Sequence, residues 1–329
     1  MKTASSQNNK WLHRFAWLVV GATFILIFIG GLVTSTESGL AVPDWPTTYG
    51  QFMFSFPLSQ MVGGILYEHG HRMVASVVGM LMVILAVWLW LKEPRKWVRN
   101  LGWLALLAVI VQGVLGGLTV LFLLPQPISV AHGALAQTFF CLTIALTLFT
   151  SPQWEQSRRQ LDDEHKPALR TLTTITTALV FVQLILGAIM RHTKSGLAIP
   201  DFPLAFGKLI PPFESSHVAI HFAHRVGALI VTGFIVWTVS RIFRYYRTEP
   251  MLRKPAILLS CAIATQLALG AFTIWSQKAV YITTAHVATG ALILGTSLTL
   301  ALRARQVMEL AVIKHVEIIG GMEKVVGKN

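Results

Sequence analysis

Long apolar runs alternate with short polar segments along the whole chain. Eight of these runs approach or exceed the roughly 20 residues that a helix needs to cross a bilayer. They are too long and too rich in leucine to be strands of a membrane barrel. The pattern predicts membrane-spanning helices at residues 11–35, 68–91, 98–123, 129–150, 169–191, 218–243, 255–275 and 280–302. The predicted fold class is therefore an all-α polytopic membrane protein.

Composition and charge agree with this picture. Hydrophobic residues make up 54% of the chain and charged residues only 12%. A net charge of +13 could indicate a nucleic-acid partner, but the basic residues lie between the apolar runs and not on one soluble face. We therefore expect a lipid membrane and no nucleic acid. Cys141 and Cys261 both lie inside apolar runs, so no disulfide framework is predicted.

The distribution of lysine and arginine predicts the orientation. Basic residues crowd the N-terminus, the linkers at 92–95, 151–167 and 244–254, and the start of the C-terminal tail. The intervening loops hold only Arg191, Lys194, Lys208 and Lys278. By the positive-inside rule, both termini are cytoplasmic and the two long loops face outward. The first apolar run is too long for a signal-peptide core, so we interpret it as a retained span.

The chain contains an internal repeat. Matching segments lie 153 to 157 residues apart, and they are 38–46 with 195–203, 112–116 with 266–270, 71–72 with 224–225, and 131–132 with 285–286. Because each half has an even number of spans, both halves enter the membrane from the same side. We expect parallel repeats related by an axis along the membrane normal, forming two four-helix bundles. The predicted units are an N-terminal bundle (1–150), a cytoplasmic linker (151–168), a C-terminal bundle (169–303) and a cytoplasmic tail (304–329).

Each half supplies two histidines at matching positions near the predicted outer face: His71 and His132, then His224 and His286. A single histidine within a membrane is commonly a hydrogen-bonded interior residue. Two repeated pairs favour ligation, and two imidazoles from facing helices provide the axial ligands of a haem iron. Zinc sites usually need three or four protein ligands. The four histidines are therefore predicted to bind haem iron.

Neighbouring residues suggest further roles. Arg72 and Arg225 directly follow two of these histidines, and we expect each to pair with a haem propionate, the alternative being snorkelling to the interface. Several helix glycines permit close approach either of a flat ring or simply of another helix. These glycines are Gly113, Gly116, Gly117, Gly187 and Gly270.

The two halves differ three residues before the first histidine of each pair. Glu68 occupies this position in the first half and His221 occupies it in the second. Glu68 could accept a proton or stabilise positive charge on a reacting substrate. Alternatively, it caps the first turn of its helix. Both interpretations stay open at this point.

The long loops share the pattern Ser-Gly-Leu-Ala-x-Pro-Asp-aromatic-Pro, in which Gly, Pro and Asp specify a fixed turn. We expect the loops to cover the two haem sites, with their aromatic rings against the macrocycle. Nothing in the chain resembles a nucleotide-binding loop, a Ser/His/Asp triad or a zinc signature.

Residues 11–303 resemble the haem A synthases of bacteria and mitochondria. The resemblance rests on residues 31–34 (Gly-Leu-Val-Thr) and on Glu68, the two His-Arg pairs, His132 and His286. It implies oxidation of a ring methyl of haem O to the formyl group of haem A, by successive hydroxylation and loss of water. It also implies that His71 and His132 flank the substrate haem, that His224 and His286 hold a permanent haem b, and that Glu68 lies near the reacting methyl.

The resemblance also implies the setting. We expect an integral protein of a bacterial inner (plasma) membrane that works with haem O synthase and in cytochrome oxidase assembly. Some bacterial members carry a cysteine pair in a long loop, but neither long loop of this chain has a cysteine. A loop disulfide therefore cannot relay electrons here, and the electron acceptor is left open.

Two other functions use some of the same residues. A dihaem b carrier that passes electrons between quinone and an outer acceptor would need the four histidines but gives no reason for Glu68. A transporter with a proton relay predicts polar groups near mid-membrane, whereas these groups cluster near the outer ends of the spans.

Overall fold

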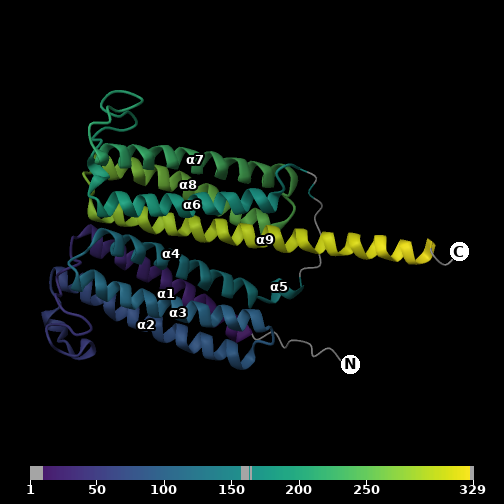
Figure 1. Ribbon diagram of the computed structural model, residues 1–329, viewed down its shortest axis with the longest axis horizontal. Coiled ribbons are helices and arrows are strands. Elements are labelled where there is room, and N and C mark those ends of the chain that lie inside the picture. Colours follow the sequence, from purple (N-terminus) through teal and green to yellow (C-terminus); the bar gives the residue numbers. More distant parts are fainter. Residues whose placement is uncertain (1–9, 157–162, 164, 327–329) are drawn as a thin grey trace.

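The computed structural model describes residues 10–156, 163 and 165–326, and the regular structure in this part of the chain is helical. Eight long helices dominate it (Figure 1): α1 (Lys10–Ser35), α2 (Gly64–Lys92), α3 (Lys96–Leu121), α4 (Gln126–Phe149), α6 (Leu169–His192), α7 (Ser216–Tyr245), α8 (Pro250–Trp275) and α9 (Val280–Val326). Short elements join them: η1 (Met53–Ser55), η2 (Leu58–Gln60), α5 (Pro152–Gln156) and η3 (Ser195–Leu197). All eight long helices are apolar enough to span a membrane, α9 over Val280–Val307. The predicted polytopic all-α fold class is confirmed.

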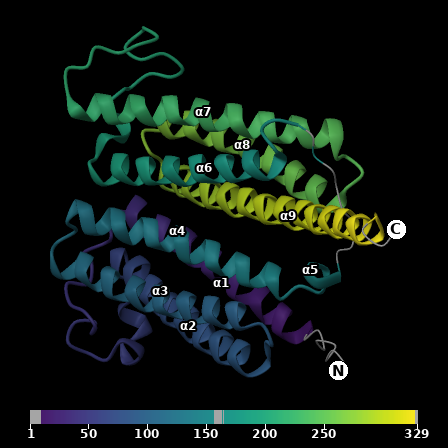
Figure 2. The ribbon, with the colours of Figure 1, turned by 45° about the vertical axis from the view of Figure 1, so that its right-hand side comes forward.

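The helices pack in two groups. In the first, α1 contacts α2 and α4, and α3 contacts the same two helices; in the second, α7 packs between α6 and α8, and α9 packs on α6 and α8. The groups meet where α1 and α4 contact α6 and α9 (Figures 1 and 2). The predicted symmetry axis and the predicted unit boundaries stay predictions.

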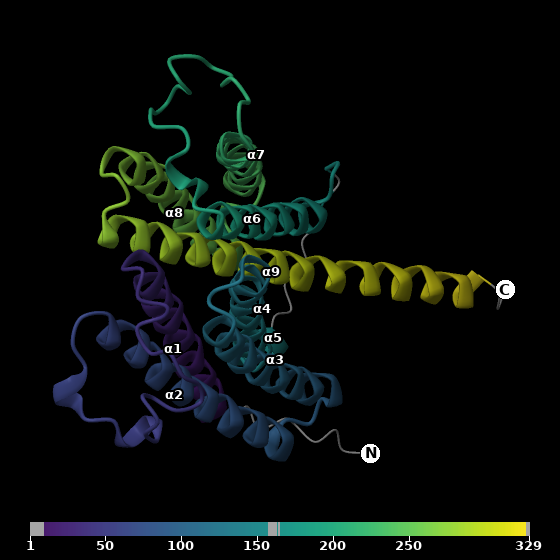
Figure 3. The same ribbon diagram turned by 60° about the vertical axis from the view of Figure 1, so that its left-hand side comes forward.

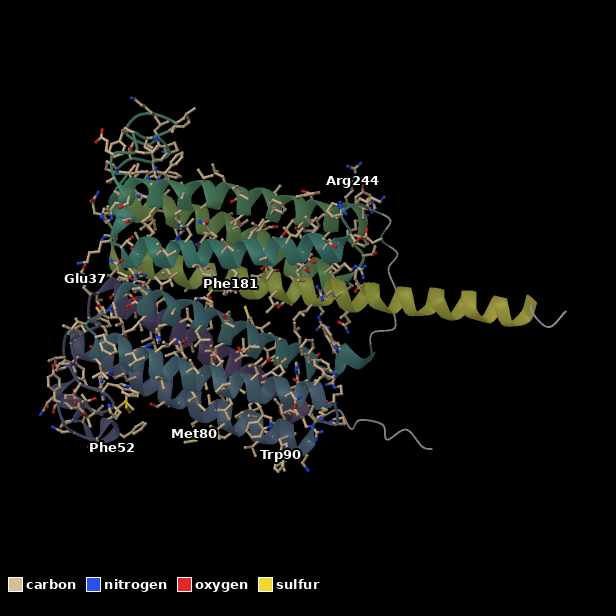
Figure 4. All side chains as sticks on the ribbon, in the orientation of Figure 1. Glu37, Phe52, Met80, Trp90, Phe181 and Arg244 are labelled. Atoms are coloured by element: carbon tan, nitrogen blue, oxygen red, sulfur yellow. The ribbon has the colours of Figure 1, made fainter. Side chains whose placement is uncertain are left out.

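Helix faces divide between the protein interior and lipid. On α8, Leu252, Ala256 and Leu259 recur at helical spacing and are fully buried, whereas Leu258 is 45% exposed. Met80 on α2 projects outward in the same way (Figure 4). Apolar side chains that face away from a helical bundle of this hydrophobicity are suited to lipid contact and not to water.

The two long loops, residues 36–63 and 193–215, lie at the same end of the molecule (Figure 1), the end that is turned toward the viewer in Figure 3. Glu37 and Phe52 mark this end in Figure 4, and Trp90 and Arg244 mark the opposite end. α1 begins at that opposite end, and α9 runs on beyond the bundle there (Figure 1). Which end faces the cytoplasm stays a prediction from the positive-inside rule.

Most helix ends lie within a few residues of the predictions, and α8 begins five residues early, at Pro250. Two further differences, at α2 and α9, have a clear cause in the sequence. α2 begins at Gly64 and not at Glu68, because the chain turns at Gly63, whose φ of 56° suits glycine. α9 continues to Val326, although residue 302 was predicted as the end of this span. Between Arg303 and Ile319 the sequence has neither proline nor glycine to end the helix.

Adjacent leucines on α8 test this division of helix faces. Leu259→Ala should destabilise the protein by about 2–5 kcal/mol, because it opens a cavity in the second helix group. Leu258→Ala should change stability by only about 0.5 kcal/mol, since this side chain faces outward. Thermal unfolding of both variants in the same detergent gives the comparison. Equal shifts in melting temperature would contradict the packing described above.

Candidate functional site

All four predicted histidines lie against a glycine of the preceding long helix. At each contact, the imidazole Cε1 is within van der Waals distance of the position that a glycine Cβ would take. The contacts are Gly30 with His71 (3.2 Å), Gly116 with His132 (3.1 Å), Gly187 with His224 (3.1 Å) and Gly270 with His286 (3.4 Å). A larger residue at any of these positions would press on the ring. Glycine therefore lets each helix approach its neighbour closely enough to position an imidazole.

The imidazoles are grouped by half. His71 lies in the neighbourhood of His132, and His224 in the neighbourhood of His286. The Nδ1 atoms of His71, His132 and His286 are buried and have no hydrogen-bond partner among the described residues. Buried polar atoms normally have a partner, so the missing ones point to a bound group.

The composition of this donor set fits haem. The described residues contain no group of three or more His, Cys, Asp or Glu that could hold a metal ion alone. Two imidazoles per half are what a haem needs from the protein, because its macrocycle supplies the remaining iron ligands. The glycine at each ring also keeps the neighbouring backbone free of side-chain bulk.

Three of the four rings are also contacted by a glutamine one helical turn from the glycine. The Gln183 amide nitrogen donates to the His224 carbonyl at 2.8 Å and lies 3.1 Å from the ring Nδ1. The Gln112 amide nitrogen donates to the His132 carbonyl at 3.0 Å and lies 3.3 Å from the ring. Gln266 lies 3.3 Å from the His286 ring. These amides restrict how the rings can turn.

Glu68 and Arg72 attach α2 to the first long loop. One Glu68 oxygen accepts the Val42 N–H at 2.7 Å, and the other pairs with Arg72 at 2.7 Å. Arg72 also donates to the carbonyls of Val42 (3.0 Å), Asp44 (2.7 Å) and Thr47 (3.1 Å). We call this set of contacts the first loop clamp.

His221 and Arg225 form an equivalent second loop clamp. The His221 ring lies 3.2 Å from the Ile199 N–H and 3.2 Å from the Arg225 Nε–H. Arg225 donates to the carbonyls of Ile199 (3.2 Å), Asp201 (2.7 Å) and Leu204 (2.8 Å). A carboxylate accepts two such donors at once, whereas a neutral imidazole has one acceptor nitrogen. The first clamp is therefore better satisfied than the second.

The clamps bear on three alternatives from the sequence. The capping interpretation of Glu68 is wrong, because α2 has no acidic residue in its first turn. Snorkelling of Arg72 and Arg225 to the interface stays an untested alternative, and both guanidinium groups bind loop carbonyls. Their pairing with haem propionates stays a prediction, and it would have to share donors that the loops already occupy.

The loops themselves contain matching turns. Asp201 accepts the N–H groups of Phe206 and Gly207, which lower the pKa of its carboxyl. Phe206 and Gly207 both have positive φ, as the central residues of a type I′ turn require. Asp44 holds the turn at Tyr49 and Gly50 in the same way. The fixed turns therefore lie just after the repeated motif, and the Asp of each motif holds its turn.

The first loop also contacts the site. A Cβ at Gly117 would lie only 2.4 Å from the Trp45 ring, so this ring packs directly on the α3 backbone. Gly117 is the residue next to the glycine that contacts His132. The loop therefore covers the end of α3 nearest to that histidine.

A family model described as COX15-CtaA, cytochrome oxidase assembly protein, matches residues 13–298. The chain belongs to this family. Members with similar sequences are named heme A synthase. The protein from Geobacillus kaustophilus is 24% identical over 82% of this chain and 85% of its own length. Those from Alkalihalophilus pseudofirmus and Halalkalibacterium halodurans are each 28% identical over 84% of this chain and 92% of theirs. The predicted family resemblance is confirmed.

Some site residues of this family member escaped the sequence reasoning. Gly30 and Gln183 were not singled out. The pattern Gln-x-x-x-Gly at 112–116, 183–187 and 266–270 would have indicated Gln183, whereas Gly30 follows Leu26 and is outside this pattern. Arg191 is a further case, because it reaches from α6 to α1 and donates to Gly31 and Ser35 there. No local pattern in the sequence marks such a contact between the halves.

The first loop clamp can be tested by proteolysis. Arg72→Ala removes a charged donor from three loop carbonyls, so chymotrypsin should cleave the exposed residues Phe52 and Phe54 roughly tenfold faster. Arg225→Ala is the matched control and should instead expose the second loop near Phe206. If both variants leave the first loop equally protected, Arg72 does not hold it.

The glycine contacts can be tested on one helix. Gly116→Leu would place a side chain where the His132 ring lies, and we expect it to lower haem binding by roughly tenfold or more. Gly113→Leu is the control, because nothing lies within 4 Å of its Cβ position. Absorbance titration of the purified variants with haem measures both affinities. Similar affinities would show that the contact does not position His132.

Proposed function

We propose that this protein is a haem A synthase, which oxidises a ring methyl of haem O to the formyl group of haem A. The family match over residues 13–298 is the observation that carries the proposal. The relatives named heme A synthase align over most of their own length. The two pairs of histidines, each with its ring packed against a helix glycine, support one site for a substrate haem and one for a resident haem.

We further propose a division of labour between the halves. His71 and His132 bind the substrate haem O, and His224 and His286 hold haem b. Bound at the second site, haem b would carry electrons away from the oxidation. The presence of a carboxylate beside the first pair, and of an imidazole at the same position beside the second, supports this assignment.

Glu68 is the proposed catalytic residue. It lies three residues before His71, so the two side chains share a helix face. Oxidation of a methyl group releases protons, and the Glu68 carboxylate can accept one at the oxygen that faces Val42 or Arg72. Arg72 compensates the negative charge while the site is at rest.

The first loop clamp would keep water from the reacting group. It ties the loop to the ligand-bearing helix α2, and Trp45 ties the same loop to α3. His221 also clamps a loop, so clamping alone does not require a carboxylate. The electron-carrier alternative would need clamping only, whereas haem A formation would need the charge of Glu68.

We propose that the long loops face outward from a bacterial plasma membrane and that both termini are cytoplasmic. Haem O would come from haem O synthase, and haem A would pass to cytochrome oxidase assembly. Arg72 and Arg225 are the residues we would assign to the haem propionates, in addition to their loop contacts.

The activity is tested by expressing the full chain with a source of haem O, extracting the haems and identifying them by mass. Haem A together with haem b supports the proposal. Haem b alone, with no haem A in the membranes, would favour the electron carrier. A colourless protein would contradict both functions.

The role of Glu68 is tested with Glu68→His, which copies the second loop clamp but removes the carboxylate. We expect haem A formation to fall by roughly 100-fold or more, since that is the usual contribution of a general base. Haem b content should stay normal, and the first loop should be protected from chymotrypsin at least as well as the second loop, which an imidazole clamps. Normal haem A formation by this variant would show that the carboxylate is not catalytic.

A further inference from the structure

His71 is the one ring of the four that no glutamine contacts among the described residues. Gln183 precedes Gly187 by four residues, and the equivalent position before Gly30 is Leu26. The second histidines of the two halves do not differ in this way, because a glutamine lies beside both His132 and His286. The asymmetry is therefore confined to the first histidine of each half.

A second substitution accompanies the first. Gly227 follows His224 by three residues, and a Cβ at this position would lie only 2.1 Å from the Gln183 amide oxygen. The equivalent residue after His71 is Val74. Leu26 and Val74 both pack against the same apolar cluster of the first helix group. In the second half, Gly227 therefore leaves space for the Gln183 amide. In the first half, Leu26 and Val74 fill the equivalent space with apolar side chains.

This exchange changes how firmly the ring is held. Gln183 binds both the backbone carbonyl and the ring of His224, which fixes the direction of the imidazole. The His71 ring has its contact with Gly30 but makes no hydrogen bond within the described residues, and its Nδ1 is buried without a partner. The Gln183 amide restricts the rotation of the His224 ring, so this ring loses less freedom on binding a metal than the His71 ring does.

We propose that His71 is the release ligand, meaning the axial ligand that detaches when a haem leaves the first site and reattaches when the next one enters. The inference rests on the proposed function. When substrate and product are both haems, one site must exchange its haem while the other retains it. The missing glutamine weakens one ligand of the exchanging site and neither ligand of the retaining site. Leu26 and Gln183 act as positioning residues through their histidines.

The test exchanges the two packing arrangements in the full-length protein. Leu26→Gln/Val74→Gly introduces the amide beside His71, and Gln183→Leu/Gly227→Val removes it beside His224. Each purified protein, loaded with haem, is mixed with excess apomyoglobin, and the haems that transfer are identified over time. In the wild type, haem O or haem A should leave faster than haem b.

The first double variant should slow the release of haem O and haem A by roughly two- to tenfold, and the second should speed the release of haem b by a similar factor. Leu26→Met is the control, because it keeps the volume and adds no amide; it should release haem at the wild-type rate. An unchanged rate in Leu26→Gln/Val74→Gly, in protein that retains haem b normally, would overturn the proposal. If Leu26→Gln/Val74→Gly does not fold, the rate of haem b release from Gln183→Leu/Gly227→Val decides. A wild-type rate of release in this second variant would overturn the proposal.

Failure of the proposed function gives a different result. Wild-type protein without haem O or haem A would contradict the synthase activity and not the release ligand. In that case both sites are loaded with haem b, and two release phases are expected. Only the faster phase should respond to Leu26→Gln/Val74→Gly. A single phase, or a response of the slower phase alone, would contradict the role of His71.

Discussion

Close contact between a histidine ring and a helix glycine is the constraint on which both sites depend. The contact occurs at α1 with α2, α3 with α4, α6 with α7, and α8 with α9. Each one brings a polar ring into an apolar helix interface, and at His71, His132 and His286 a buried ring nitrogen has no partner among the described residues, which is costly. A haem iron would satisfy that nitrogen. Helix packing and ligand placement are therefore set by the same four glycines.

The loop clamps are built on the same helices as the first of the two paired histidines of each half. Arg72 and Arg225 each bind three loop carbonyls, and each directly follows a histidine in the sequence. Movement of a long loop would therefore be transmitted to a ligand-bearing helix. The halves share this arrangement but differ in charge, because Glu68 compensates Arg72 while His221 offers Arg225 no negative charge. Chemistry that releases protons is suited to the half with the carboxylate.

Much of this could be predicted from the sequence, and the remainder depended on long-range contacts. Apolar periodicity located all eight helices, and the repeat indicated the four histidines. The sequence also indicated Gly116, Gly187 and Gly270. It did not show whether each glycine makes room for a flat ring or for a neighbouring helix. The partners of Glu68 and Arg72 lie some 20 to 30 residues away in a loop, so their hydrogen bonds depend on how that loop folds back. The start of α2 was misplaced because apolar periodicity does not mark a glycine turn such as Gly63.

The central claim is that the chain holds two separate haem sites, one in each half, and haem stoichiometry measures it most directly. Wild-type protein loaded with haem should bind two haems per chain. The double variants His71→Ala/His132→Ala and His224→Ala/His286→Ala should each bind one, with the absorbance spectrum of the site that remains. One haem per wild-type chain, or loss of both haems in either double variant, would contradict the claim.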